Sequence, residues 1–177
     1  EHVHLGSEAA IKVLRNQLMS DEREKFRMEA KNLVRLIHPH IVRLLDFGFE
    51  GSTPYLVMDY APHGTLRRRY RKGTRLPLTT ILPYVRQVAE ALQFAHNQNI
   101  VHRDIKPENI LLGRQQEILI SDFGLAVVTQ SSRSYTDKEK AGTVAYMAPE
   151  QFRGKPRPAS DQYALGIVVY ELSLIHI

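Results

Sequence analysis

Residues 101–112 read VHRDIKPENILL, a run in which apolar ends enclose six polar or charged side chains. A buried strand would not tolerate so many charges, because an unpaired buried charge is costly. A plain surface loop would not need the aliphatic anchor at residues 110–112. The stretch therefore indicates a polar loop that is held in place by its apolar end, and its polar groups are candidates for chemistry.

The bulk composition sets broad limits on what this chain can be. Its 177 residues are 43% hydrophobic and 24% charged, which suits one domain or two small lobes that share a cleft. The net charge of +5 fits an anionic ligand or substrate, but also an ordinary solvated surface. The sequence contains no cysteine, which excludes disulfides and cysteine-ligated zinc and is compatible with a cytoplasmic location.

No targeting or membrane segment is recognisable in this sequence. The start lacks the pattern of a secretory signal peptide. The most apolar run, residues 164–177, is too short and too polar to span a bilayer. We therefore expect a cytoplasmic location and no membrane contact from this segment, with any anchor lying outside it.

Residue patterns predict strands in the first part of the chain and helices in the second. Short apolar runs indicate strands at residues 9–14, 41–49, 55–60 and 117–121. Apolar residues at steps of three and four predict helices at 20–37, 78–97 and 160–174. Ser20 is the expected N-cap of the first helix. The buried face of the second should carry Leu82, Val85, Val88, Ala89, Leu92 and Ala95. This order is typical of an α+β fold.

Five short motifs follow one another along the chain. They are Ala10-Ile11-Lys12 on a strand, Glu29 in a helix, His102-Arg103-Asp104 with Asn109 five residues on, Asp122-Phe123-Gly124 after a strand, and Ala148-Pro149-Glu150. In kind and in order they resemble the eukaryotic-type serine/threonine protein kinase family, with a style similar to its bacterial members. The resemblance implies a bilobal fold, with a partial N-lobe and hinge at 1–61 and a partial C-lobe at 62–177, forming one kinase domain.

Compared with the family pattern, the domain is expected to be truncated at both ends. The glycine-rich hairpin that precedes the strand lysine is missing, because the 11 residues before Lys12 hold only one glycine, Gly6. The later helices of the C-lobe are missing too. The ending SLIHI at 173–177 departs from the family, which suggests an assembly or read-through junction. We expect this fragment by itself to be inactive.

The resemblance assigns the catalytic loop its roles in phosphoryl transfer. Asp104 would accept the proton of the substrate hydroxyl. Lys106 would neutralise charge beside the γ-phosphate, and Thr143 would brace both residues. Asn109 and Asp122 would supply oxygen ligands to Mg²⁺. Taken alone, each of these residues could be an ordinary surface charge or turn former.

Other residues would hold the nucleotide and join the two lobes. Lys12 would contact the α- and β-phosphates of ATP and pair with Glu29, a pair that forms only when the helix swings inward. By resemblance, the adenine site comprises Ala10, Met58, Asp59, Ala61 and Leu111, and the internal spine comprises Leu33, Leu44, His102, Phe123 and Asp161. Apolar members of both sets could equally be simple core residues.

The same resemblance suggests the substrate type and the regulation. A lysine two residues after Asp104 is similar to serine/threonine kinases rather than tyrosine kinases. Arg103 would bind a phosphate on the activation segment, with Ser134 and Thr136 as candidate acceptors. Glu139 would partly substitute for that phosphate, or is a solvated loop acid.

The implied partners are protein substrates, with a possible kinase homodimer for trans-autophosphorylation. No pattern supports nucleic-acid binding. A basic cluster, Arg67–Arg69 with Arg71 and Lys72, could favour an acidic partner or form a solvated helix face. Two alternatives to an active protein kinase remain: a pseudokinase-like scaffold, and a small-molecule phosphotransferase of related fold.

Overall fold

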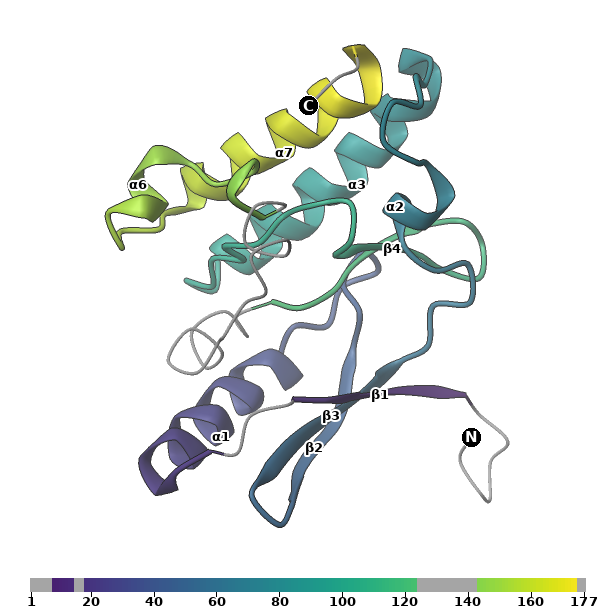
Figure 1. The fold of residues 1–177 in the computed structure, drawn as a ribbon. Helices are drawn as coiled ribbons and strands as arrows, with labels where there is room; N and C mark the ends of the chain where they lie inside the picture. Colours follow the sequence, from purple (N-terminus) through teal and green to yellow (C-terminus); the bar gives the residue numbers. More distant parts are fainter. Residues whose placement is uncertain (1–7, 15–17, 124–142, 175–177) are drawn as a thin grey trace.

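The computed structural model describes residues 8–14, 18–123 and 143–174, and shows a mixed α+β architecture (Figure 1). The first part is a three-stranded antiparallel sheet in the order β1-β3-β2. Its strands are β1 (Ala9–Val13), β2 (Leu44–Glu50) and β3 (Thr53–Asp59). A tight turn at residues 51–52 joins β2 to β3, close to the connection expected from the sequence.

The helix α1 (Ser20–Val34) packs on this sheet through Phe26 and Ala30, which are fully buried. The Phe26 ring meets the edge of Phe49 with 5.3 Å between centroids. The predicted N-cap is wrong by one residue. The cap is Met19, whose backbone amide donates to the Glu22 carboxylate at 3.0 Å, so that a glutamate of the first turn caps the helix.

The second part of the chain is mainly helical. Its elements are α2 (Leu66–Arg69), α3 (Leu78–His96), the hairpin of β4 (Ile110–Leu112) and β5 (Ile118–Ile120), α6 (Pro149–Phe152) and α7 (Pro158–Leu174). In Figure 1, α3 and α7 run side by side, and both belong to one large hydrophobic cluster that includes β5. The aliphatic anchor of the opening stretch is thus strand β4, a strand that was not predicted from the sequence.

The buried face of α3 differs from the predicted one. It consists of Ile81, Val88, Ala91, Leu92 and Ala95, whereas Leu82 is 62% exposed and Ala89 is exposed. The helix is rotated from the predicted face because Ile81 lies in line with Val88 and Leu92 on the side that meets β5 and α7. The prediction is confirmed for Val88, Leu92 and Ala95, which are buried, and Val85 packs partly buried against the same cluster.

The two parts meet along the segment that follows α1. The amide of Val42 donates to the carbonyl of Ile120 at 2.9 Å, and the amide of Ile120 donates to the carbonyl of His40 at 2.9 Å. A small cavity at this junction is lined by residues of both hydrophobic clusters, among them Leu44 and Phe123. Within the described ranges, no helix has the length and apolarity that crossing a membrane requires.

Candidate active site

The loop that precedes β4 is held in an unusual backbone conformation. Arg103 has a φ of 71°, in the left-handed region that a side chain makes unfavourable. The carboxylate of Asp161, on α7, accepts hydrogen bonds from the amides of His102 at 2.9 Å and Arg103 at 2.8 Å. The Gln151 side chain donates to the Arg103 carbonyl at 2.8 Å. Contacts from α6 and α7 therefore stabilise the loop in this conformation.

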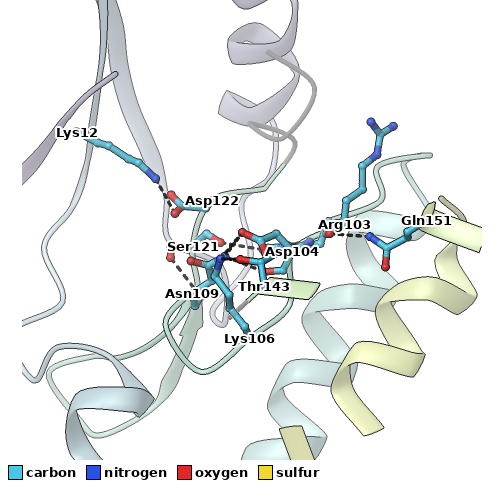
Figure 2. A network of polar contacts seen from close by, with 10 residues as sticks. Lys12, Arg103, Asp104, Lys106, Asn109, Ser121, Asp122, Thr143 and Gln151 are labelled. Carbon is cyan, nitrogen blue, oxygen red and sulfur yellow. Dashed lines mark hydrogen bonds and ion pairs between the residues drawn. The ribbon is translucent and has the colours of Figure 1, made fainter. Parts of the chain in front are cut away.

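Four polar side chains converge at the centre of this loop (Figure 2). The ammonium of Lys106 lies 2.9 Å from Oδ2 of Asp104 and donates to the hydroxyl of Thr143 at 3.0 Å. The amide of Asn109 donates to the same Asp104 oxygen at 2.9 Å and to the Asp104 carbonyl at 2.7 Å. The structure thus brings together Asp104, Lys106, Asn109 and Thr143, as the resemblance implies. The Asp104 carboxylate is oriented by two donors.

Asp122 follows β5 directly and faces this group from the next segment. Like Arg103, it lies in the left-handed region, with a φ of 69°. The preceding Ser121 donates from its amide and hydroxyl to the Asn109 carbonyl. Oδ2 of Asp122 lies 2.6 Å from the ammonium of Lys12 on β1. Lys12 reaches down from the sheet to make this ion pair, which crosses the space between the two parts of the chain (Figure 2).

Glu29 does not form the expected pair with Lys12 in this structure. Its Oε2 is buried and has no hydrogen-bond partner among the described residues. Burial raises the pKa of Glu29 to about 6, partly offset by the nearby charge of Arg103. The Arg103 guanidinium points away from Asp104 (Figure 2), and its Nε is also buried without a partner in the described part of the chain. The charge that acts on the Glu29 carboxylate is thus that of Arg103, while Lys12 pairs with Asp122.

Three residues of the expected internal spine line the junction cavity, and His102 and Asp161 lie next to them in the catalytic loop and on α7. The His102 and Phe123 rings meet edge to face, with 4.5 Å between centroids. Phe123, Leu33 and Leu44 line the cavity together. Nε2 of His102 is 2.8 Å from the Ser121 carbonyl and its Nδ1 accepts from the Asp104 amide at 3.2 Å, so both ring nitrogens of this buried histidine are bound. The arrangement favours a structural role for His102 over a role as a base.

The residues expected around adenine lie at the end of the sheet and just beyond it. Ala10 is the direct cross-strand partner of Met58, and Ala9 that of Asp59. Ala61 lies in the connection to α2, where its carbonyl accepts from Gly64. Leu111, on β4, forms a bridge to Thr65. Met58, Asp59 and Ala61 therefore follow one another from β3 into the connection to α2, with Ala10 beside them on β1 and Leu111 on β4.

Three expected regulatory residues, Ser134, Thr136 and Glu139, lie outside the described residues. Gly124, the last member of the Asp-Phe-Gly motif, lies outside them as well. Thr143 is described and contacts Lys106, as reported above.

One buried network was not predicted from the sequence. The Arg67 guanidinium donates to both oxygens of Glu171 on α7 at 2.6 and 3.0 Å, to the Tyr146 hydroxyl at 2.8 Å and to Glu108 at 2.9 Å. Burial alone would raise the pKa of Glu171, but the hydrogen bonds from Arg67 and Tyr146 hold it below its ordinary value. The grouping of Arg67 with an exposed basic cluster was therefore wrong.

A signal for this network was present in the sequence. Glu171 stands alone in the apolar run of α7, and a buried carboxylate needs a cationic partner. The sequence did not tell which of the many arginines supplies it.

The polar residues at the site fit a nucleotide phosphate and a hard cation. Asp122 offers carboxylate oxygens. Asn109 points its amide nitrogen at Asp104, which turns its carbonyl oxygen to the other side. Such oxygen donors suit Mg²⁺, which prefers a few carboxylate or amide ligands completed by phosphate and water. Lys12 adds a positive charge next to Asp122, where an anionic phosphate would otherwise be repelled.

Comparison with known proteins gives a consistent result. The model of the protein kinase domain matches residues 2–176. A probable serine/threonine-protein kinase of Clostridium acetobutylicum is 37% identical over 172 residues, which cover 96% of this chain and 26% of the relative. Serine/threonine-protein kinase PrkC of Bacillus subtilis is 39% identical over 175 residues, covering 97% of this chain and 27% of the relative.

A eukaryotic protein is similar to the same extent. Aurora kinase A-A of Xenopus laevis is 40% identical over 165 residues, covering 92% of this chain and 40% of the relative. The chain thus spans between a quarter and two-fifths of the length of these three relatives. The family match over nearly the whole chain, together with the loop geometry above, confirms the resemblance drawn from the motifs: this chain belongs to the protein kinase family and is homologous to serine/threonine kinases.

Proposed function

We propose that this chain carries the catalytic centre of a serine/threonine protein kinase, which transfers the γ-phosphate of Mg·ATP to a protein hydroxyl. The observation that carries the proposal is the convergence of Lys106, Asn109 and Thr143 on one oriented Asp104 carboxylate, with Asp122 and Lys12 facing it. Phosphoryl transfer depends on positioning and charge neutralisation, which is what such an arrangement provides.

In this mechanism, Asp104 acts as the proton acceptor. Its carboxylate orients the substrate hydroxyl and takes the proton as the new bond from that oxygen to the γ-phosphorus forms and the bond to the ADP oxygen breaks. Lys106 lies 2.9 Å from Asp104, close enough to neutralise negative charge on the transferring group. Thr143 holds the Lys106 ammonium in place through its hydroxyl.

The remaining polar residues hold the nucleotide. Asn109 and Asp122 would ligate the magnesium ion, which would supply positive charge to offset that of the phosphates. When nucleotide binds, Lys12 would leave Asp122, contact the α- and β-phosphates and pair with Glu29. Ala10, Met58, Asp59, Ala61 and Leu111 would enclose the adenine, with the Asp59 carbonyl and Ala61 amide bonding the base.

The chain contributes parts of both lobes of one bilobal kinase domain. Residues 1–61 would form a partial N-lobe with the hinge, and residues 62–177 a partial C-lobe with the catalytic loop and activation segment. Two separate hydrophobic clusters, one under the sheet and one around α3 and α7, support this division. Arg103 would bind a phosphate on Ser134 or Thr136, or the carboxylate of Glu139, and a kinase homodimer would allow phosphorylation in trans.

The test is a phosphotransfer assay with radiolabelled ATP, Mg²⁺ and serine, threonine and tyrosine peptides, using the full-length protein. We expect transfer to serine or threonine, and Asp104→Asn should reduce kcat about 10²–10⁴-fold, the size of a lost general base. Circular dichroism would verify that the variant is folded. Mg·ATP binding without any transfer would instead support the pseudokinase-like scaffold, and transfer to small molecules alone would support the related phosphotransferase.

A further inference from the structure

The segment that follows Arg67 exposes five cationic side chains within eight residues: Arg68, Arg69, Arg71, Lys72 and Arg75, here called the basic patch. The sequence has no acidic residue between Asp59 and Glu90. Among the described residues, no member of the basic patch takes part in an ion pair, unlike Arg67. The segment thus presents a concentrated positive charge that its own neighbours leave uncompensated.

The basic patch lies next to the catalytic loop. The amide of Arg67 donates to the Pro107 carbonyl at 3.0 Å, and its Nε binds Glu108 at 2.9 Å, so that the start of α2 is joined to the loop that carries Asp104 and Asn109. Helix α2 also lies beside β4 (Figure 1). A peptide whose hydroxyl reaches Asp104 would therefore have neighbouring residues within range of this charge.

Two carboxylates nearby are already neutralised. Glu171 is only 4% exposed and is bound by both terminal nitrogens of Arg67, which also pairs with Glu108. The charge of Lys72 also acts on Glu171, and that of Arg69 acts on the Tyr84 hydroxyl. Because Arg67 pairs with both Glu108 and Glu171, the charge of the basic patch is not offset by these carboxylates. The patch would therefore repel cationic substrates.

We propose that the basic patch binds acidic residues that flank the phosphorylated hydroxyl, so that this kinase prefers acidic protein substrates. This inference rests on the proposed function of the Asp104 site. A peptide fits better than nucleic acid, because the aromatic residue of this segment, Tyr70, is directed at the Tyr84 hydroxyl at 3.3 Å instead of offering a stacking surface. The position beside the catalytic loop favours a substrate over a lipid surface.

The experiment compares two serine peptides that differ only in four flanking residues, glutamate in one and glutamine in the other. With the full-length protein, we expect a KM about tenfold lower for the acidic peptide, as a few screened charge pairs would produce. The preference should disappear in 0.5 M NaCl, where the screening length is about 4 Å. The double variant Arg71→Glu, Lys72→Glu should remove the preference while kcat and the KM for the neutral peptide stay within about twofold.

A matched control keeps the overall charge change equal. Lys25→Glu with Lys31→Glu alters two exposed cations on α1, far from α2 in the fold, and should leave the acidic preference intact. Thermal unfolding would verify that both double variants are folded. An equal loss of preference in the control would overturn the proposal, because it would assign the effect to net charge rather than to the basic patch.

Binding measurements separate this inference from the proposed function. Fluorescence anisotropy follows a labelled acidic peptide on the wild type and on the two double variants, without need of catalysis. If no peptide is phosphorylated but acidic binding depends on Arg71 and Lys72, the proposed function fails and the acidic site stands. If neutral and acidic peptides are phosphorylated equally, the site is refuted and the function stands. Binding through the basic patch to phosphatidylserine vesicles or to RNA, but not to the peptide, also refutes it.

Discussion

The Glu29 carboxylate lies half-buried on α1, and the ammonium that it was expected to meet is held by Asp122. Lys12 thus pairs with Asp122, one of its two possible acidic partners. The other, Glu29, is half-buried and has little contact with water. Burial then acts on the carboxylate alone, which is why its pKa is raised. With a pKa of about 6, this carboxyl changes its charge close to neutral pH.

Glu29→Gln should raise stability and lower activity. The pKa of Glu29 is about 6 in the folded protein against an ordinary value of 4.5. The Glu29 carboxyl therefore contributes to the free energy of unfolding fully below pH 4.5, and this contribution is lost as the pH rises through 6. Glutamine stays neutral, so the variant should unfold at a higher temperature than the wild type at pH 7, with the difference shrinking towards pH 4.5. Its kcat should fall, because glutamine cannot form the ion pair with Lys12.

The control for this pH effect is Glu24→Gln on the same helix. The Glu24 side chain is 65% exposed, so the variant should follow the wild-type unfolding temperature across this pH range. A Glu29→Gln variant whose unfolding temperature stays parallel to that of the wild type from pH 4.5 to 7 would contradict the assignment.

At the scale of elements, the catalytic loop depends on α7 for its shape. Asp161 is 1% exposed and accepts from two consecutive amides and from the His96 ring at 2.7 Å. The left-handed conformation of Arg103 costs about 1–3 kcal/mol where it is not supported. The buried end of a helix therefore provides the acceptors that keep the strained loop in place.

Asp161→Asn replaces one carboxylate oxygen by an NH2 group. That group would face one of the two backbone N–H groups, of His102 or Arg103, from which the carboxylate accepts. We expect a loss of about 1–3 kcal/mol in the free energy of unfolding, because one buried amide loses its acceptor. The kcat should fall as well, since Asp104 follows the displaced backbone directly. Urea titration and steady-state kinetics measure the two effects, and an Asp161→Asn variant with full kcat would show that the loop keeps its shape without the second carboxylate oxygen.

Arg67 joins α2 to α7 and to the catalytic loop, so its loss should destabilise all three. Arg67→Met should reduce the free energy of unfolding by about 3–5 kcal/mol, because Glu171 is left buried without a counterion. Arg86→Met removes a side chain that is 82% exposed from a pair within α3, so it should cost less than about 1 kcal/mol. Equal effects of the two changes in urea titration would contradict a structural role for the network.

The sequence predicted what depends on neighbours along the chain. The strand at Lys12, the loop around Asp104 and the helix α7 follow from local patterns and motif spacing. The partner of Lys12, the inward turn of Arg67 and the buried face of α3 depend on residues that are distant in sequence. Lys12 could meet either of two carboxylates, and only the placement of α1 and β5 relative to the sheet decides which one is near.

At the scale of the whole molecule, the described residues form two hydrophobic clusters that meet at Phe123. Its ring packs on His102 and lines the junction cavity opposite Leu44 and Met58, which belong to the sheet side. The cavity leaves part of the contact between the two clusters unfilled, so Phe123 carries much of what remains. Phe123 is therefore the side chain through which the two clusters are most directly coupled.

Phe123→Ala should enlarge this cavity and weaken the coupling of the two clusters. We expect a loss of about 3–5 kcal/mol in the free energy of unfolding and a broader calorimetric transition, because the parts would unfold less cooperatively. Phe123→Leu should retain most of the stability and a single sharp transition. A Phe123→Ala variant that melts as sharply as the wild type would show that other contacts hold the two parts together.

The ion pair between Lys12 and Asp122 has a consequence for proton balance. Lys12 and a divalent cation would compete for the Asp122 carboxylate. Binding of Mg·ATP would therefore release Lys12, which could then pair with Glu29. Pairing with an ammonium lowers a carboxyl pKa, and Glu29 starts from about 6. Nucleotide uptake near pH 6 should therefore expel a fraction of a proton, and affinity should rise between pH 5 and 7. Calorimetric titration in buffers of different ionisation enthalpy would count that proton, and Glu29→Gln should abolish it.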